Sequence, residues 1–192
     1  MKTSYKALSV VLGATALLTS FTTPLFVVVT SPISGSTATV KFNLKQIIDM
    51  LSINGVDKFI NRLFYDSAYA DFCPKFLTTF IFFWSAVICS FLIIIFSIVK
   101  RKYIYNIVCS AYGLISLLIS SIAISSISSQ AAAGNSEIGK NLLSIFDQFL
   151  NIQSINCGTA FFFMGLCFIV VFVISGSLAI VNKPQNPQNN KK

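Results

Sequence analysis

The sequence predicts an all-α membrane protein, a bundle of four transmembrane helices with a small extracytoplasmic cap of short amphipathic helices and one candidate strand. Two observations lead to this fold class. The 192 residues are 55% hydrophobic and only 10% charged, whereas about 25% of the residues in soluble domains are charged. The chain also contains four long uncharged apolar runs, and about 20 such residues in a helix cross a hydrocarbon core about 30 Å thick.

The first run, at residues 7–30, follows a short basic N-terminus at residues 1–6 that we expect to be cytoplasmic. A cleaved signal peptide would have the same opening. An uncleaved first helix is favoured because the apolar run is long and lacks a clean A-x-A cleavage site. Pro24 removes one backbone donor, so a kink is expected near the outer end of this helix.

Residues 31–76 form the predicted first extracytoplasmic loop. Within it, residues 37–42 (TATVKF) alternate between apolar and polar side chains, which favours a short strand. Residues 44–64 then repeat apolar side chains at helical spacing, interrupted at Asn54 and Gly55. Two short amphipathic helices therefore form the predicted cap.

The second run, at residues 77–99, ends at three consecutive cations, Lys100, Arg101 and Lys102. Cations are costly to move across lipid, and cytoplasmic loops collect Lys and Arg. Residues 100–102 are therefore predicted to form a cytoplasmic turn that anchors the topology.

The third run, at residues 103–129, is rich in serine. Ser116 and Ser120 are four residues apart, as are Ser121 and Ser125, so each pair shares a helix face. Small residues at this spacing allow helices to pack closely in lipid. A polar pore lining is the alternative interpretation of the same residues.

Residues 130–157 form the predicted second extracytoplasmic loop, with an amphipathic helical stripe at residues 137–150. The fourth run, at residues 158–181, contains Gly165 and Gly176, which we expect to be points of close helix contact. Residues 182–192 are polar and contain two prolines, which predicts a disordered cytoplasmic tail.

The positions of the charges agree with this topology. The predicted cytoplasmic side carries no acid, and all of the net charge of +8 lies there, on Lys2, Lys6, Lys100, Arg101, Lys102, Lys183, Lys191 and Lys192. On the other side, the cations and the acids balance. The distribution follows the positive-inside rule, so both termini are expected to be cytoplasmic.

Two of the five cysteines, Cys73 and Cys157, precede the second and the fourth membrane run and lie at the predicted outer mouth of the bundle. We expect a disulfide between them, which in the chain-entropy model would stabilise the fold by about 4 kcal/mol. The alternative is two buried free thiols.

Composition excludes several classes of function. The chain has no histidine, which is the commonest metal ligand and general base. No charge lies within the four runs, although intramembrane charges usually mark proton relays and coupled transport. We therefore expect no enzyme activity, no cofactor and no metal. Nucleic acid is not an expected partner, because the basic residues form no stripe interleaved with aromatics.

This architecture, with four spans, a short inner turn and a first outer loop longer than the second, resembles that of the claudin and PMP22-like tetraspan superfamily. The resemblance covers the layout of the whole chain and not the first-loop signature, because that loop has no tryptophan and only Cys73. It implies a plasma-membrane protein that organises, joins or scaffolds membranes through its outer loops and lateral helix packing. Its partners would be the lipid bilayer, further copies of the chain or other membrane proteins. The alternative function is a subunit of an oligomeric channel or transporter.

Overall fold

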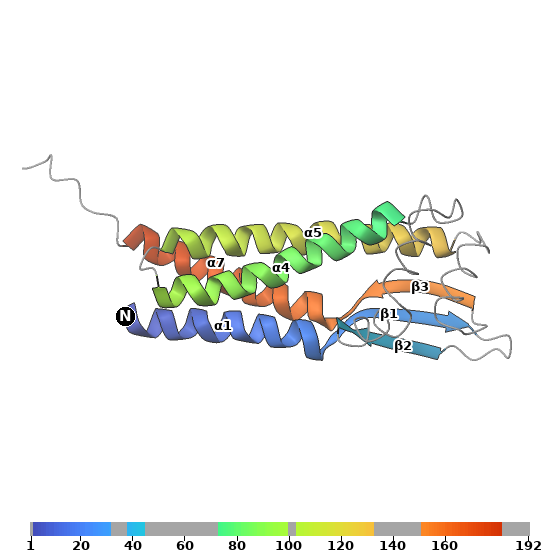
Figure 1. The fold of residues 1–192 in the computed structure, drawn as a ribbon, viewed down its shortest axis with the longest axis horizontal. Coiled ribbons are helices and arrows are strands. Elements are labelled where there is room, and N and C mark those ends of the chain that lie inside the picture. Colours follow the sequence, from blue (N-terminus) through green and yellow to red (C-terminus); the bar gives the residue numbers. More distant parts are fainter. Residues whose placement is uncertain (1, 32–37, 45–72, 100–102, 133–150, 182–192) are drawn as a thin grey trace, which may run out of the picture.

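The computed structural model describes residues 2–31, 38–44, 73–99, 103–132 and 151–181. Four helices form a bundle, and three strands form a sheet beyond one end of it (Figure 1). The helices are α1 (Lys2–Thr22), α4 (Cys73–Val99), α5 (Tyr103–Ala132) and α7 (Thr159–Val181). The strands are β1 (Pro24–Ser31), β2 (Ala38–Asn43) and β3 (Asn151–Cys157).

All four helices are long and apolar enough to cross a membrane, as the sequence predicted. Large apolar side chains are exposed on each of them, among them Val11, Ile88, Leu118 and Phe162. In water such a surface would be unfavourable, whereas lipid solvates it at no cost. The helical bundle is therefore that of a multi-pass membrane protein.

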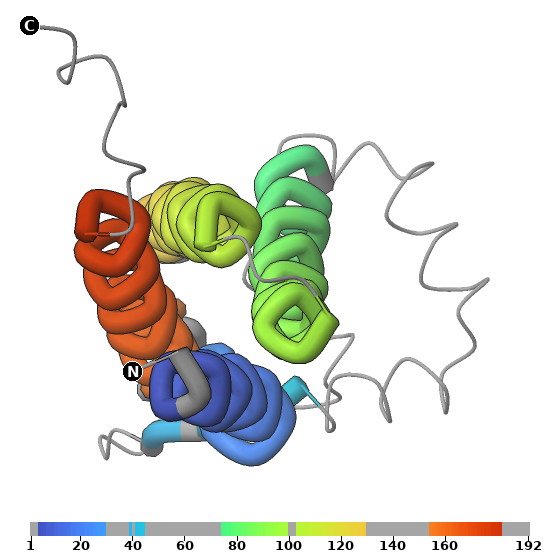
Figure 2. Tube along the Cα trace, turned by 90° about the vertical axis from the view of Figure 1, so that its left-hand side faces the viewer, coloured from blue at the N-terminus to red at the C-terminus, as the bar shows by residue number. Residues whose placement is uncertain are grey.

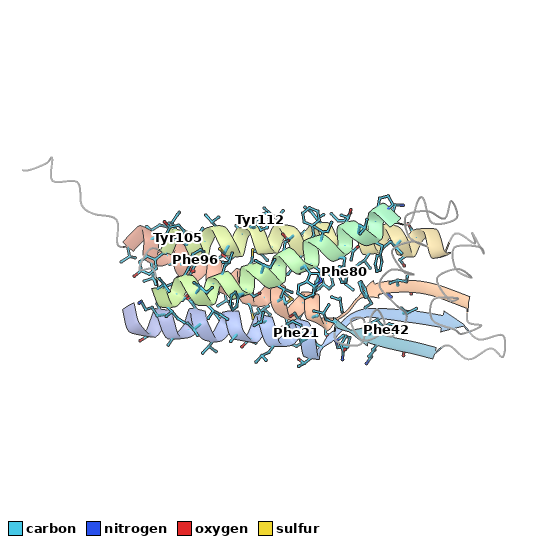
Figure 3. The ribbon with its side chains drawn as sticks, viewed as in Figure 1. Phe21, Phe42, Phe80, Phe96, Tyr105 and Tyr112 are labelled. Carbon is cyan, nitrogen blue, oxygen red and sulfur yellow. The ribbon has the colours of Figure 1, made fainter. Side chains whose placement is uncertain are left out.

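The four helices form a ring in which each contacts two neighbours: α1 lies beside α4, α4 beside α5, α5 beside α7, and α7 beside α1 (Figure 2). Fully buried side chains such as Phe83, Ile93 and Phe168 fill its interior. Phe96 of α4 packs against Tyr105 of α5, with ring centroids 5.2 Å apart (Figure 3).

Helix α1 ends at Thr22, so the predicted first span through residue 30 is wrong at its outer end. Thr23 closes the helix, because both its amide and its hydroxyl donate to the carbonyl oxygen of Thr19. Pro24 follows and cannot donate to a further helical turn. The next residues are rich in β-branched valine, which favours a strand. The chain therefore leaves the helix and forms β1.

The predicted strand at residues 37–42 is confirmed as β2. The other two strands correct the sequence-based prediction: β1 forms where the sequence predicts the outer end of the first helix, and β3 forms where it predicts a loop. The three strands form an antiparallel sheet in the order β2-β1-β3. The predicted bundle of four helices is therefore confirmed, and the fold adds to it a three-stranded sheet where the sequence predicted one short strand.

The other helices fall close to their predicted positions. Helix α4 begins at Cys73 rather than residue 77, and α5 continues to Ala132 rather than residue 129. At about 1.5 Å per residue, the 30 residues of α5 measure about 45 Å. Helix α5 is thus longer than a hydrocarbon core about 30 Å thick, and its C-terminal part lies beside β3 (Figure 1). The predicted cap helices beyond Leu44 and at 137–150, the 100–102 turn and the 182–192 tail lie outside the described residues.

Candidate functional site

One pair of the predicted α5 serines is used in contacts with α4. The hydroxyl of Ser85 donates to Oγ of Ser116 at 2.9 Å. Ser120 donates to the backbone carbonyl of Thr79, also at 2.9 Å. Ser116 and Ser120 are fully buried. These contacts agree with close helix packing, because both hydroxyls are bonded inside the protein.

The two serines of the other predicted pair, Ser121 and Ser125, have different surroundings. The thiol of Cys157 in β3 donates to Oγ of Ser121 at 3.3 Å, whereas Ser125 is exposed. Ser128, which sequence reasoning missed, accepts the backbone N–H of Ile155 at 3.1 Å. The sequence could have indicated Ser128, because it follows Ser121 by seven residues and this spacing places both side chains on the same helix face. One face of α5 therefore holds β3.

Cys157 is a free thiol, so the disulfide predicted between Cys73 and Cys157 is wrong for this structure. The side chain points from β3 to Ser121 of α5 and is half-buried. Burial raises the pKa of this thiol, and the hydrogen bond with Ser121 lowers it by less. The side chain of Cys73 lies outside the described residues.

The close-contact glycines are not the predicted ones. A Cβ on Gly165 would just reach Leu117, and one on Gly176 would meet open space. By contrast, a Cβ on Gly113 would lie 2.7 Å from the ring of Phe168, and one on Gly158 would overlap the carbonyl group of Pro24. Gly158 also donates its N–H to the carbonyl oxygen of Leu25 at 2.7 Å. The start of α7 and the start of β1 therefore cross in direct backbone contact.

A buried polar cluster joins the four helices at the end opposite the sheet. The side-chain amide of Asn106 in α5 donates to the hydroxyl oxygens of Tyr5 in α1 and Ser97 in α4, at 2.8 and 2.9 Å. The Tyr5 hydroxyl is also hydrogen-bonded to Ser175 in α7 at 2.8 Å. We call Tyr5, Ser97, Asn106 and Ser175 the polar cluster.

The register of the sheet gives it two unlike faces, because side chains directly opposite each other on neighbouring strands share a face. On the inner face, Val28 pairs with Ile155, and Phe26 with Cys157. Ile155 is buried, and Phe26 and Val28 pack against the hydrophobic core. The inner face therefore fixes the sheet to the bundle.

On the opposite face of the sheet, half-buried valines lie between polar side chains. Val27 pairs with Lys41 and Asn156, and Val29 pairs with Thr39 and Ser154. Lys41, Thr39 and Asn156 are exposed. We call Val27, Val29, Thr39, Lys41, Ser154 and Asn156 the outer sheet face.

Within the described part of the chain, no three His, Cys, Asp or Glu side chains lie close enough together to hold a metal ion. The predicted topology anchor, Lys100, Arg101 and Lys102, lies outside the described ranges. Two features thus stand out, the exposed outer sheet face and the buried polar cluster.

Comparison with known proteins does not extend this description. No family model, no curated protein and no solved structure matches the chain.

Proposed function

We propose that this chain is a non-enzymatic tetraspan membrane protein that organises, joins or scaffolds membranes by binding partner proteins through its outer sheet face. The partners are other copies of this chain or other membrane proteins. The proposal places the protein in the plasma membrane with both termini in the cytoplasm and the sheet outside. The proposal retains the resemblance to claudin and PMP22-like tetraspans. This resemblance concerns the architecture and is based on the predicted topology alone.

The observation that carries the proposal is the construction of the outer sheet face. Two valines lie at its centre, and exposed Thr39, Lys41 and Asn156 surround them. An apolar centre with a polar rim is the usual composition of a protein interface. The sheet is also held in place on its other side, where β3 is bonded to α5 through Ser121 and Ser128. A rigid surface loses little conformational entropy on binding.

The channel alternative receives less support. In the channel alternative the α5 serines line a pore, but the hydroxyls of Ser116 and Ser120 are buried and form hydrogen bonds with α4. Of the four predicted serines, Ser125 alone is exposed, and its neighbours on the same stretch of α5 include exposed Ile122. A mixed surface of this kind suits lipid or a partner helix.

The test compares two variants of the full chain in cells. Replacing Lys41 and Asn156 by Glu together places two negative charges on the outer sheet face. Ser129→Glu is the matched control, because Ser129 is also exposed and lies near the end of α5 that adjoins the sheet. Complexes are measured by cross-linking with a membrane-impermeant reagent followed by mass determination of the purified complexes.

We expect the amount of cross-linked complex to fall at least about tenfold in the double variant. Repulsive or desolvated charge at an interface weakens the free energy of binding by more than about 1.4 kcal/mol. The Ser129→Glu control should keep them. Equal complex formation by both variants would contradict the proposal. A flux assay in liposomes tests the alternative: a current that Ser120→Leu changes would favour the channel.

A further inference from the structure

The polar cluster leaves one hydrogen-bond acceptor unused. Oδ1 of Asn106 is buried and finds no donor among the described residues. Asn106 itself is only 2% exposed. A buried carbonyl oxygen without a donor is unfavourable, because folding has removed the water that it would otherwise bind.

The orientation of the Asn106 amide is fixed by its neighbours. Ser97 donates its own hydroxyl hydrogen to the carbonyl oxygen of Ile93 at 2.7 Å. Its oxygen can therefore only accept from Asn106, and an N–H group is needed there. Turning the amide round would place Oδ1 against the Ser97 oxygen at 2.9 Å with no hydrogen between them. Oδ1 thus keeps its place on the unbonded side of the amide.

The same cluster leaves one hydrogen-bond donor unused. The hydroxyls of Tyr5 and Ser175 share one oxygen–oxygen contact of 2.8 Å, and either can be the donor. Each carries one hydrogen, and the Tyr5 oxygen already accepts from Asn106. One of the two hydrogens therefore has no acceptor among the described residues, whichever group donates.

The buried cluster therefore contains one hydrogen-bond donor and one acceptor without partners. A group that can both donate and accept a hydrogen bond would satisfy the two. A water molecule does so, because it can donate to Oδ1 and accept the remaining hydroxyl hydrogen. We propose that the polar cluster is a binding site for one water molecule, which bridges Asn106 of α5 to the hydroxyl pair formed by Tyr5 of α1 and Ser175 of α7.

This water would complete the link between the helix ends opposite the sheet. Asn106 already bonds to α1 and α4, and the bridge adds a second path to α7. The site belongs to the interior of the bundle, as all four residues are at least nine-tenths buried. It is independent of the outer sheet face, so either proposal can fail alone.

The test is a structure of the full chain crystallised from a lipid mesophase, at a resolution that shows ordered water. We expect a solvent peak about 2.7–3.2 Å from Oδ1 of Asn106 and at a similar distance from the hydroxyl of Tyr5 or Ser175. Asn106→Leu removes the acceptor and should lose the peak. Ser177→Ala should retain it, since Ser177 is exposed and bonds only within its own helix, to the carbonyl oxygen of Val173.

A second measurement uses the wild-type protein in nanodiscs. The side-chain amide protons of Asn106 should show a nuclear Overhauser contact with a long-lived water, whether or not the Leu variant folds. The proposal is overturned if the wild-type cluster contains no solvent peak while other internal waters are visible, or if the Asn106 amide is found reversed.

Discussion

Single residues set the closest contacts of this protein. Gly158 lies where the start of α7 meets the backbone of Pro24 and Leu25, and no space remains there for a Cβ. Gly176, within α7, has open space in the corresponding direction. Two glycines that look alike in an apolar run thus have different roles, and only the neighbouring chain distinguishes them.

We predict that Gly158→Ala destabilises the protein by about 3 kcal/mol or more, since the added methyl meets backbone and not a flexible side chain. Gly176→Ala is the matched control and should change the free energy of unfolding by less than about 1 kcal/mol. Thermal unfolding in detergent compares the two variants. Similar unfolding temperatures would contradict the crossing of α7 and β1 described here.

A second prediction concerns the thiol of Cys157. Burial raises its pKa, so less thiolate is present at neutral pH than in an ordinary cysteine. In a variant with Cys157 as its single cysteine, alkylation by iodoacetamide at pH 8 should be about fivefold slower or more than in the unfolded chain. The rate should keep rising at pH values where an ordinary cysteine has levelled off.

Ser121→Ala supplies a control for the alkylation experiment. It removes the hydrogen bond that lowers the pKa of Cys157, so alkylation at pH 8 should become slower still. A rate equal to that of the unfolded chain would show that the thiol does not face α5.

At the scale of elements, α5 connects the rest of the molecule. One part of its surface bonds to α4 through Ser116 and Ser120, and another bonds to β3 through Ser121 and Ser128. Helix α5 can contact both α4 and β3 because it is long and continues past the neighbouring helices alongside the sheet (Figure 1). The position of the sheet therefore depends on α5 as well as on the crossing at Gly158.

The contact between Ser85 and Ser116 can be measured with a double-mutant cycle. Replacing both by Ala should give a coupling free energy of about 0.6 kcal/mol, the average for such hydrogen bonds between membrane helices. The pair Ser85 and Ser125 serves as the control, as Ser125 is exposed, and its coupling should be near zero. Equal coupling for both pairs would argue against the α4–α5 register.

At the scale of the whole molecule, α1 begins and α7 ends on the same side of the bundle, opposite the sheet (Figure 1). A bundle of four spans requires this arrangement. The net charge of +8 is concentrated on the segments predicted for that side. The proposed topology therefore has that side in the cytoplasm, following the positive-inside rule.

We predict that epitope tags at the two termini are both inaccessible to antibody in intact cells and both become accessible after permeabilisation. A tag inserted after Ser31, at the end of β1 on the sheet side, should be labelled in intact cells. Labelling of one terminus without permeabilisation would contradict the proposed topology and the assignment of the outer sheet face.

The sequence by itself determined the four spans, because lipid requires long uncharged helices and these are visible in the order of residues. It also predicted β2, whose alternation of side chains is local. The strand β1 could not be predicted in this way, since its apolar residues suit a helix as well, and one of its two partners, β3, comes from a distant part of the chain. The tertiary structure alone decided which serines bond to α4, which glycine meets the backbone of another element and where the thiol of Cys157 points. Each of these depends on what lies opposite a residue in space, which its neighbours in the sequence do not specify.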